Sequence, residues 1–133
     1  MQRIHSPKLE AIALRSLTSA DAKLTGWLYP RIGSDHFSYT PSQEFFRRIQ
    51  FLTRKTGELP SWEDLLDDLA ISEDTRDVMA KSNSGVIDNR KDARRLLEKL
   101  DEYRKARVFF GIQRPVDQAV DHDGFEAEAG GEL

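Results

Sequence analysis

Histidine is the side chain best suited to proton transfer and zinc binding near neutral pH, so the three histidines are the leading candidates for such chemistry. They are His5, His36 and His122, and they lie far apart in the sequence. No pair has the HxxxH or HxxE spacing that would place two ligands on one face of a helix. The chain has no cysteine, which removes thiolate ligands, cysteine nucleophiles and disulfides. The sequence therefore predicts no metal site and no catalytic residue.

Acidic pairs and glycines could support hydrolysis or phosphate binding, but their positions argue against both. Glu63-Asp64 and Asp67-Asp68 are adjacent in sequence, and adjacent side chains on a helix point about 100° apart. Such carboxylates cannot jointly flank one substrate. The glycines form no GxxxxGK[ST] pattern, so this chain lacks a phosphate-binding loop of that type. We expect no cofactor in this chain and no ATPase activity.

Two short helical patterns joined by a turn lie between Pro41 and Leu66, and they invite comparison with a DNA-reading helix-turn-helix. The second pattern is acidic, however, and the phosphates of a duplex would repel it. The basic residues of the first pattern are therefore predicted to face solvent or a protein partner. Three of them are the partner-facing candidates: Arg47, Arg48 and Arg54.

The overall charge gives the chain no general attraction to nucleic acid. Lys and Arg number 20 against 23 acids, for a net charge of -3, so we expect single-stranded DNA to bind weakly at most. The 133 residues suffice for one domain with a modest core. The sequence has neither a signal-peptide pattern nor an apolar run approaching the roughly 18 residues of a membrane span. We therefore expect a cytoplasmic protein with no membrane partner.

Helix-start signals recur along the chain, whereas period-two alternation never persists, which predicts an all-α fold. Ser6 followed by Pro7 begins the first helix, and a second runs over 22–28. Thr40, Pro41 and Gln43 have the arrangement of a capping box and predict the start of a third. Two further starts are predicted at Ser61 and Ser72, and the longest pattern opens at Asp88 or Asn89.

The apolar residues of these patterns recur at helical spacing and define a compact multi-helix head. Leu69 is expected to extend the apolar face of the helix that begins after Ser61. The predicted core comprises Leu14, Leu17, Phe37, Phe45, Phe46, Ile49, Leu52, Leu65 and Leu66.

The long C-terminal helix, over about 89–113, has an apolar stripe flanked by basic residues. This stripe is more apolar than an isolated surface helix can leave exposed, so either the head or a second chain must cover it. We predict that it mediates self-association, as half of a helical hairpin. The candidates are Leu96, Leu100, Tyr103, Arg107 and Phe110.

A change in composition marks the end of the helical domain. Pro115 ends or kinks the long helix, and from Asp117 onward the sequence has six acids and no Lys or Arg. We therefore divide the chain into a helical domain, 1–114, and an acidic, glycine-containing linker or tail, 115–133.

The order of these parts resembles the N-terminal domain of DnaB-type replicative helicases over about residues 4–114. The resemblance runs through PKLEAIALRSL, HFSYTPSQEFFRRIQFL, LPSWEDLLDDL and the basic helix ARRLLEKLDEYRKARVFFGI. Glu10 matches the acid of the family's first helix, whereas Arg15 stands where the family commonly has glycine. The remaining matches are Ile12, Ala13, Leu14, Leu17, Phe37, Phe45, Phe46 and Ile49.

This resemblance implies a non-catalytic assembly and partner-docking domain of bacterial or phage origin. In that family, helical hairpins pair two subunits, and six subunits form a collar that binds primase or a helicase loader. ATP and Mg²⁺ would belong only to a motor domain that this chain lacks, which suggests an excised or truncated collar. Two alternatives stay open: a stand-alone loader- or inhibitor-like accessory protein, and a DNA-binding regulator that uses the basic helix 90–107.

Overall fold

The first two helices begin at side chains that cap them. The computed structural model describes residues 6–19, 21–82 and 85–109. The Ser6 hydroxyl accepts a hydrogen bond from the Leu9 N–H at 3.3 Å and begins α1 (Pro7–Leu17). The Asp21 carboxylate accepts from the N–H groups of Lys23 and Leu24, each at 3.1 Å, and begins α2 (Ala22–Leu28). These caps satisfy donors that have no partner within the helix.

The rest of the described chain is also helical. Two short 3-10 helices, η1 (Tyr29–Arg31) and η2 (Ser34–His36), lead into α3 (Thr40–Thr56). Ser61 caps α4 (Trp62–Leu66), Ser72 caps α5 (Glu73–Ala80), and Asn89 precedes α6 (Arg90–Phe109). The predicted all-α class is confirmed, with six α-helices in the described part of the chain.

The start of α3 differs from the predicted capping box. The N-cap is Tyr39, which makes no side-chain cap bond, and Thr40 is already helical. The Gln43 side chain donates instead to the Phe37 carbonyl at 2.7 Å. The tertiary structure overrides the local signal here, because Glu10 of α1 accepts the Tyr39 N–H. At the other end α3 stops at Gly57, whose φ of 82° is a left-handed conformation that favours glycine.

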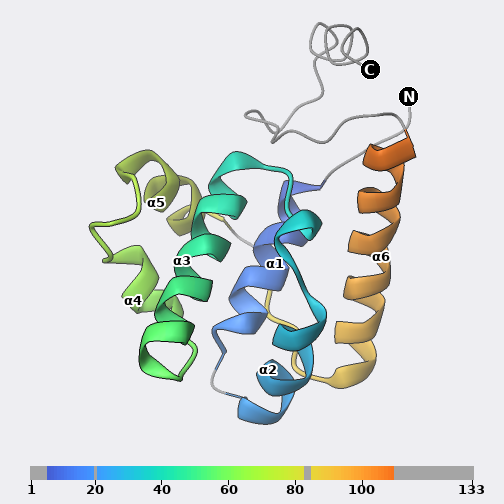
Figure 1. Cartoon of the computed structure of the whole chain (residues 1–133), viewed down its shortest axis with the longest axis horizontal. Helices are drawn as coiled ribbons and strands as arrows, with labels where there is room; N and C mark the ends of the chain where they lie inside the picture. The colour runs from blue at the N-terminus through green and yellow to red at the C-terminus, as the bar shows by residue number, and fades with distance from the viewer. Residues whose placement is uncertain (1–5, 20, 83–84, 110–133) are drawn as a thin grey trace, which may run out of the picture.

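Helix α1 occupies the centre of the molecule, with α3 on one side and α6 on the other (Figure 1). α4 and α5 lie beyond α3, at the opposite end from α6, and α2 packs against both α1 and α6. The shared core is rich in aromatic side chains. The Phe46 ring lies 4.7 Å from the Phe37 ring, and the Phe45 ring lies 5.3 Å from the Trp62 ring, measured between centroids.

Most of the predicted core residues lie in this core. Leu52 and Leu66 are half-buried against it, while Leu69 is 85% exposed. Leu69 departs from the predicted face because α4 ends at Leu66, so the helical spacing no longer governs its direction. The fully buried members are Leu14, Leu17, Phe37, Phe45, Phe46, Ile49 and Leu65.

Phe46→Ala should lower the free energy of unfolding by about 3–5 kcal/mol, because it removes a fully buried ring and leaves a cavity. That loss is a large part of the stability of an ordinary domain. Arg47→Ala, at the exposed neighbouring position, should change stability by less than about 0.5 kcal/mol. Urea unfolding monitored by circular dichroism measures both, and equal midpoints for Phe46→Ala and the wild type would contradict the assigned packing.

Candidate functional site

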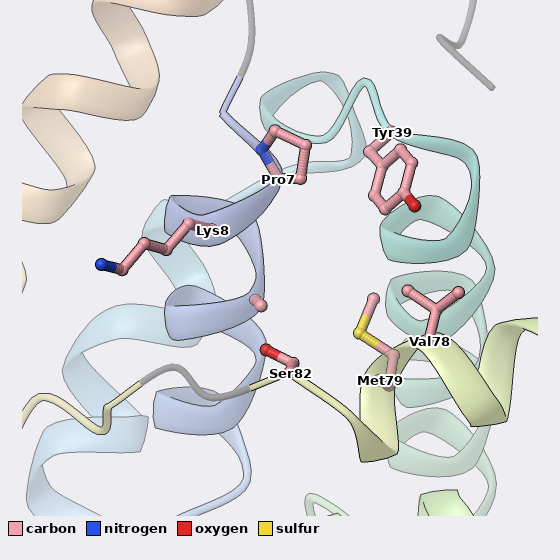
Figure 2. A pocket seen from close by; sticks show the side chains of 7 residues that line it. Pro7, Lys8, Tyr39, Val78, Met79 and Ser82 are labelled. Carbon is pink, nitrogen blue, oxygen red and sulfur yellow. The ribbon is translucent and has the colours of Figure 1, made fainter. Parts of the chain in front are cut away.

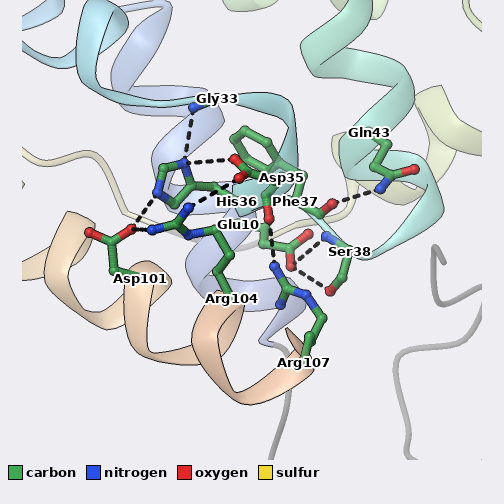
Figure 3. A network of polar contacts seen from close by, with 10 residues as sticks. All are labelled: Glu10, Gly33, Asp35, His36, Phe37, Ser38, Gln43, Asp101, Arg104 and Arg107. Carbon is green, nitrogen blue, oxygen red and sulfur yellow. Dashed lines mark hydrogen bonds and ion pairs between the residues drawn. The ribbon is translucent and has the colours of Figure 1, made fainter. Parts of the chain in front are cut away.

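Polar side chains from α1, η2 and α6 converge in one network (Figure 3). At its centre is Glu10 of α1, which is only 1% exposed. One carboxylate oxygen accepts the Ser38 N–H at 3.1 Å and the Ser38 hydroxyl at 3.0 Å, and the other accepts the Tyr39 N–H at 3.1 Å. Burial raises the pKa of Glu10, and these hydrogen bonds together with the charge of Arg107 only partly offset that effect.

Arg107 supplies the positive charge that faces Glu10. Its side chain is buried, and a guanidinium N–H donates to the Asp35 carbonyl at 2.8 Å. Burial lowers the pKa of Arg107, whereas the negative charges of Glu10 and Asp35 act in the opposite direction. A guanidinium remains protonated in proteins, so Arg107 joins the last turn of α6 to the head as a charged group.

His36 has both ring nitrogens engaged. Nδ1 lies 2.9 Å from the Gly33 N–H and must accept that hydrogen bond. The neutral tautomer therefore carries its proton on Nε2, which donates to Asp101 at 2.7 Å. With no free nitrogen and a buried ring, His36 is not placed to act as a general base or a metal ligand.

The remaining charges of the network also have structural partners. Arg104 contacts Asp101 at 3.2 Å and Asp35 at 3.1 Å, so α6 and η2 are joined by several polar contacts. In the described ranges, no group of three or more His, Cys, Asp or Glu side chains could hold a metal ion. His5 and His122 lie outside the described residues. This arrangement can position α6, and it offers no exposed acid–base pair for chemistry.

A second carboxylate organises the other end of the molecule. Glu44 of α3 accepts the Ser72 N–H at 2.7 Å, the Ser72 hydroxyl at 2.9 Å and the Thr75 hydroxyl at 2.6 Å. Partial burial opposes its ionisation, but the hydrogen bonds outweigh burial, and the pKa of Glu44 lies below its ordinary value. Glu44 thereby fixes the start of α5 against α3.

The three partner-facing candidates differ in their surroundings. Arg47 and Arg54 are exposed on α3. Arg48 is not free for a partner, because its Nε donates to Asp68 at 2.6 Å and its guanidinium lies 5.0 Å from the Phe51 ring centroid. Burial opposes ionisation of Asp68, but the hydrogen bonds from Arg48 and the Ala70 N–H, together with the charges of Arg48 and Arg76, outweigh it and lower the pKa of Asp68.

The self-association candidates do not form one exposed stripe. Leu96 and Leu100 are 5% and 1% exposed, because α1, α2 and η2 of the same chain cover them. Arg107 belongs to the Glu10 network, and Tyr103 is half-buried with Lys99 beside its ring. Phe110 lies outside the described residues, as does the proposed tail at 115–133. An interface on α6 would have to use other side chains than Leu96 and Leu100.

A groove of about 460 Å³ opens between α1, α5 and the start of α3 (Figure 2). Its lining is mostly apolar, and Lys8 and Tyr39 contribute polar groups. The residues around it are Pro7, Lys8, Ala11, Tyr39, Val78, Met79 and Ser82. Among the described residues that line the groove there is no acid, histidine or cysteine.

Sequence reasoning missed the pairing of His36 with Asp101 and the charge opposite Glu10. A signal was available in α6, where Asp101, Arg104 and Arg107 recur at three-residue steps and so lie on neighbouring parts of the helix surface. Their partners are 65 to 72 residues away in sequence, which local spacing cannot identify.

No protein-family model, curated protein or solved structure matches the chain. Across the described segments, no helix is both long enough and apolar enough to span a membrane. The all-α fold and the geometry of its polar groups are therefore the basis for the functional argument.

The raised pKa of Glu10 predicts a pH dependence of stability. A group whose pKa is raised on folding contributes stability that is complete below its unfolded pKa, here near 4.5, and that is lost as the pH rises through its folded pKa. The difference in free energy of unfolding between wild type and Glu10→Gln should therefore shift in favour of the wild type as the pH falls from neutral toward 4.5.

Urea unfolding at several pH values measures this difference. The contributions of the other titrating groups are the same in both proteins, so they cancel in the difference. Glu58→Gln, at an exposed carboxyl between α3 and α4, is the matched control. A wild-type advantage that grew as the pH rose would contradict the assigned direction of the Glu10 shift.

Proposed function

We propose that this chain is a non-catalytic assembly and partner-docking domain, of the kind that forms the collar of a replicative DNA helicase. The proposal rests on a contrast between the polar groups of the interior, which hold helices together, and the exposed apolar side chains at the end of α6. The side chains suited to chemistry, among them Glu10 and His36, are engaged in holding helices together. The end of α6 instead presents apolar surface.

Val108 and Phe109, in the last turn of α6, are 60% and 82% exposed. Large exposed apolar side chains that lie together are characteristic of contact surfaces. The apolar contacts that hold the helix to the head lie further back, at Ala93, Leu96 and Leu100, while Arg107 joins the last turn to the head by polar contacts. A second copy could therefore bind at the end of α6 without disturbing the core, which supports self-association through this end rather than through the buried stripe.

The order of helices supports the assignment to a helicase collar, because it resembles that of the collar domain of DnaB-type helicases. In that case Arg47 and Arg54, both exposed on α3, are available for a primase or a loader. A stand-alone accessory protein of the loader or inhibitor class would share this fold. The reading frame of the gene distinguishes the two, since a collar domain continues into a GxxxxGK[ST] motor.

Replacing Val108 and Phe109 together with Asp should abolish self-association of the full chain, because it places two charges in the proposed apolar contact. Two such side chains bury little area, so we expect a weak dimer that forms only at high protein concentration. Sedimentation velocity over a concentration series measures it, while circular dichroism checks that helical content is retained.

The matched control changes two other exposed apolar residues, Leu69 and Val86, to Asp. This control should dimerise as the wild type does. A wild-type chain that stays monomeric at millimolar concentration would exclude self-association, and a dimer that survives the Val108/Phe109 change would place the interface elsewhere.

A further inference from the structure

We propose that Trp27 and the three arginines around it form a binding site for the phosphates of single-stranded nucleic acid. The guanidinium carbon of Arg31 lies 4.5 Å from the centroid of the Trp27 ring. The guanidinium carbons of Arg90 and Arg94 lie 5.8 and 5.9 Å from the same centroid. The cluster joins α2, η1 and the first turns of α6, and all three arginines are exposed.

These guanidinium groups are gathered without being neutralised. Among the described residues, no carboxylate lies within ion-pair distance of Arg31, Arg90 or Arg94, although other arginines of this chain have such partners. The acids next to them in sequence are engaged elsewhere, since the Asn89 amide donates to Asp88 at 3.0 Å and to Asp92 at 2.9 Å. Three like charges close together favour a bound anion.

The indole explains how the cluster is held. A guanidinium over an aromatic ring is attracted by the ring electrons and keeps its charge. Its N–H groups lie in its own plane, so those not bonded within the protein remain available to a ligand. Arg31 is further fixed by a 2.7 Å hydrogen bond to the Trp27 carbonyl. Arg31 is therefore held in place before a ligand arrives, which lowers the entropy cost of its binding.

The chemistry favours nucleic acid over an acidic peptide. Guanidinium forks match carboxylate and phosphate oxygens alike, but guanidinium planes can also stack on a nucleic-acid base, and an acidic peptide has no base to offer. Arg90 and Arg94 are four residues apart on α6, about 6 Å along the axis, so they can contact neighbouring phosphates of one strand. Further along α6 the exposed face includes Glu98 and Glu102, which would repel a long duplex.

The charge of the chain does not oppose local binding. The net charge of -3 includes six acids from Asp117 onward, and over residues 1–116 there are 20 basic residues against 17 acids. The segment that contains the cluster is therefore mildly basic. This site does not depend on the proposed assembly role, because it lies at the opposite end of α6 from Val108 and Phe109.

The test measures binding of a short fluorescein-labelled oligothymidine to the full chain by fluorescence anisotropy, at salt concentrations from about 50 to about 200 mM. With three phosphate contacts, the logarithm of the affinity should fall with the logarithm of salt concentration with a slope of about -2. Changing Arg31, Arg90 and Arg94 together to Gln should weaken binding about tenfold or more and remove most of the slope.

The matched control changes three other exposed arginines to Gln, namely Arg47, Arg54 and Arg95. It removes the same charge and should retain nearly full affinity. As a milder variant, Arg90→Lys with Arg94→Lys keeps the charge and the fold but lacks the planar fork, and it should show an intermediate loss.

Three results would overturn the proposal. Equal losses in the two triple variants would mean that only the overall charge matters. Competition by oligoglutamate as strong as that by unlabelled oligothymidine would assign the site to acidic peptides, and tighter binding of a duplex would exclude the single-strand assignment. None of these results bears on the sedimentation of the Val108/Phe109 variant, so the assembly proposal is tested separately.

Discussion

The fold depends on one buried carboxylate. Glu10 lies in the central helix and accepts three hydrogen bonds from residues 28 and 29 positions away, while Arg107 of the last helix lies opposite its charge. Taking a carboxylate out of water costs several kcal/mol unless its hydrogen-bonding capacity is satisfied. The arrangement therefore penalises any packing in which the Ser38–Tyr39 segment or α6 is displaced. Apolar burial supplies the stability of this core, and Glu10 restricts the arrangements that the core can adopt.

At the other end of the molecule, the Glu44 carboxylate likewise fixes a distant segment through its hydrogen bonds. Helix α5 is only eight residues long, and isolated helices of that length are not stable in water. Glu44 bonds to both the N–H and the hydroxyl of Ser72, and Ser72 is itself the cap of α5. A side chain of α3 thus sets where α5 begins. The short helix α5 is therefore held by polar contacts from a longer one, and Glu44 is an ionisable group occupied in a structural role.

The helices could be predicted from sequence because their signals are local. Caps such as Ser61 and Ser72, and the spacing of Phe45, Phe46 and Ile49, act within a few residues. At the start of α3, by contrast, a distant group decided the outcome. Tyr39 replaces Thr40 as the cap of α3 because Glu10 holds its N–H. Periodicity also identified the apolar stripe of α6, but it could not tell whether the stripe is covered by the same chain or by another.

The arginines divide into two groups that sequence alone does not separate. Arg48 and Arg104 pair with carboxylates, and Arg107 faces the charges of Glu10 and Asp35, so these three have their charge committed to the fold. The guanidinium groups of Arg31, Arg90 and Arg94 lie within about 6 Å of the Trp27 ring centroid, a contact that leaves their charge intact. An ion pair would have fixed these side chains equally well and would have cancelled their field. The contacts with the ring therefore leave the surface around Trp27 positive, a feature that the net charge of the chain conceals.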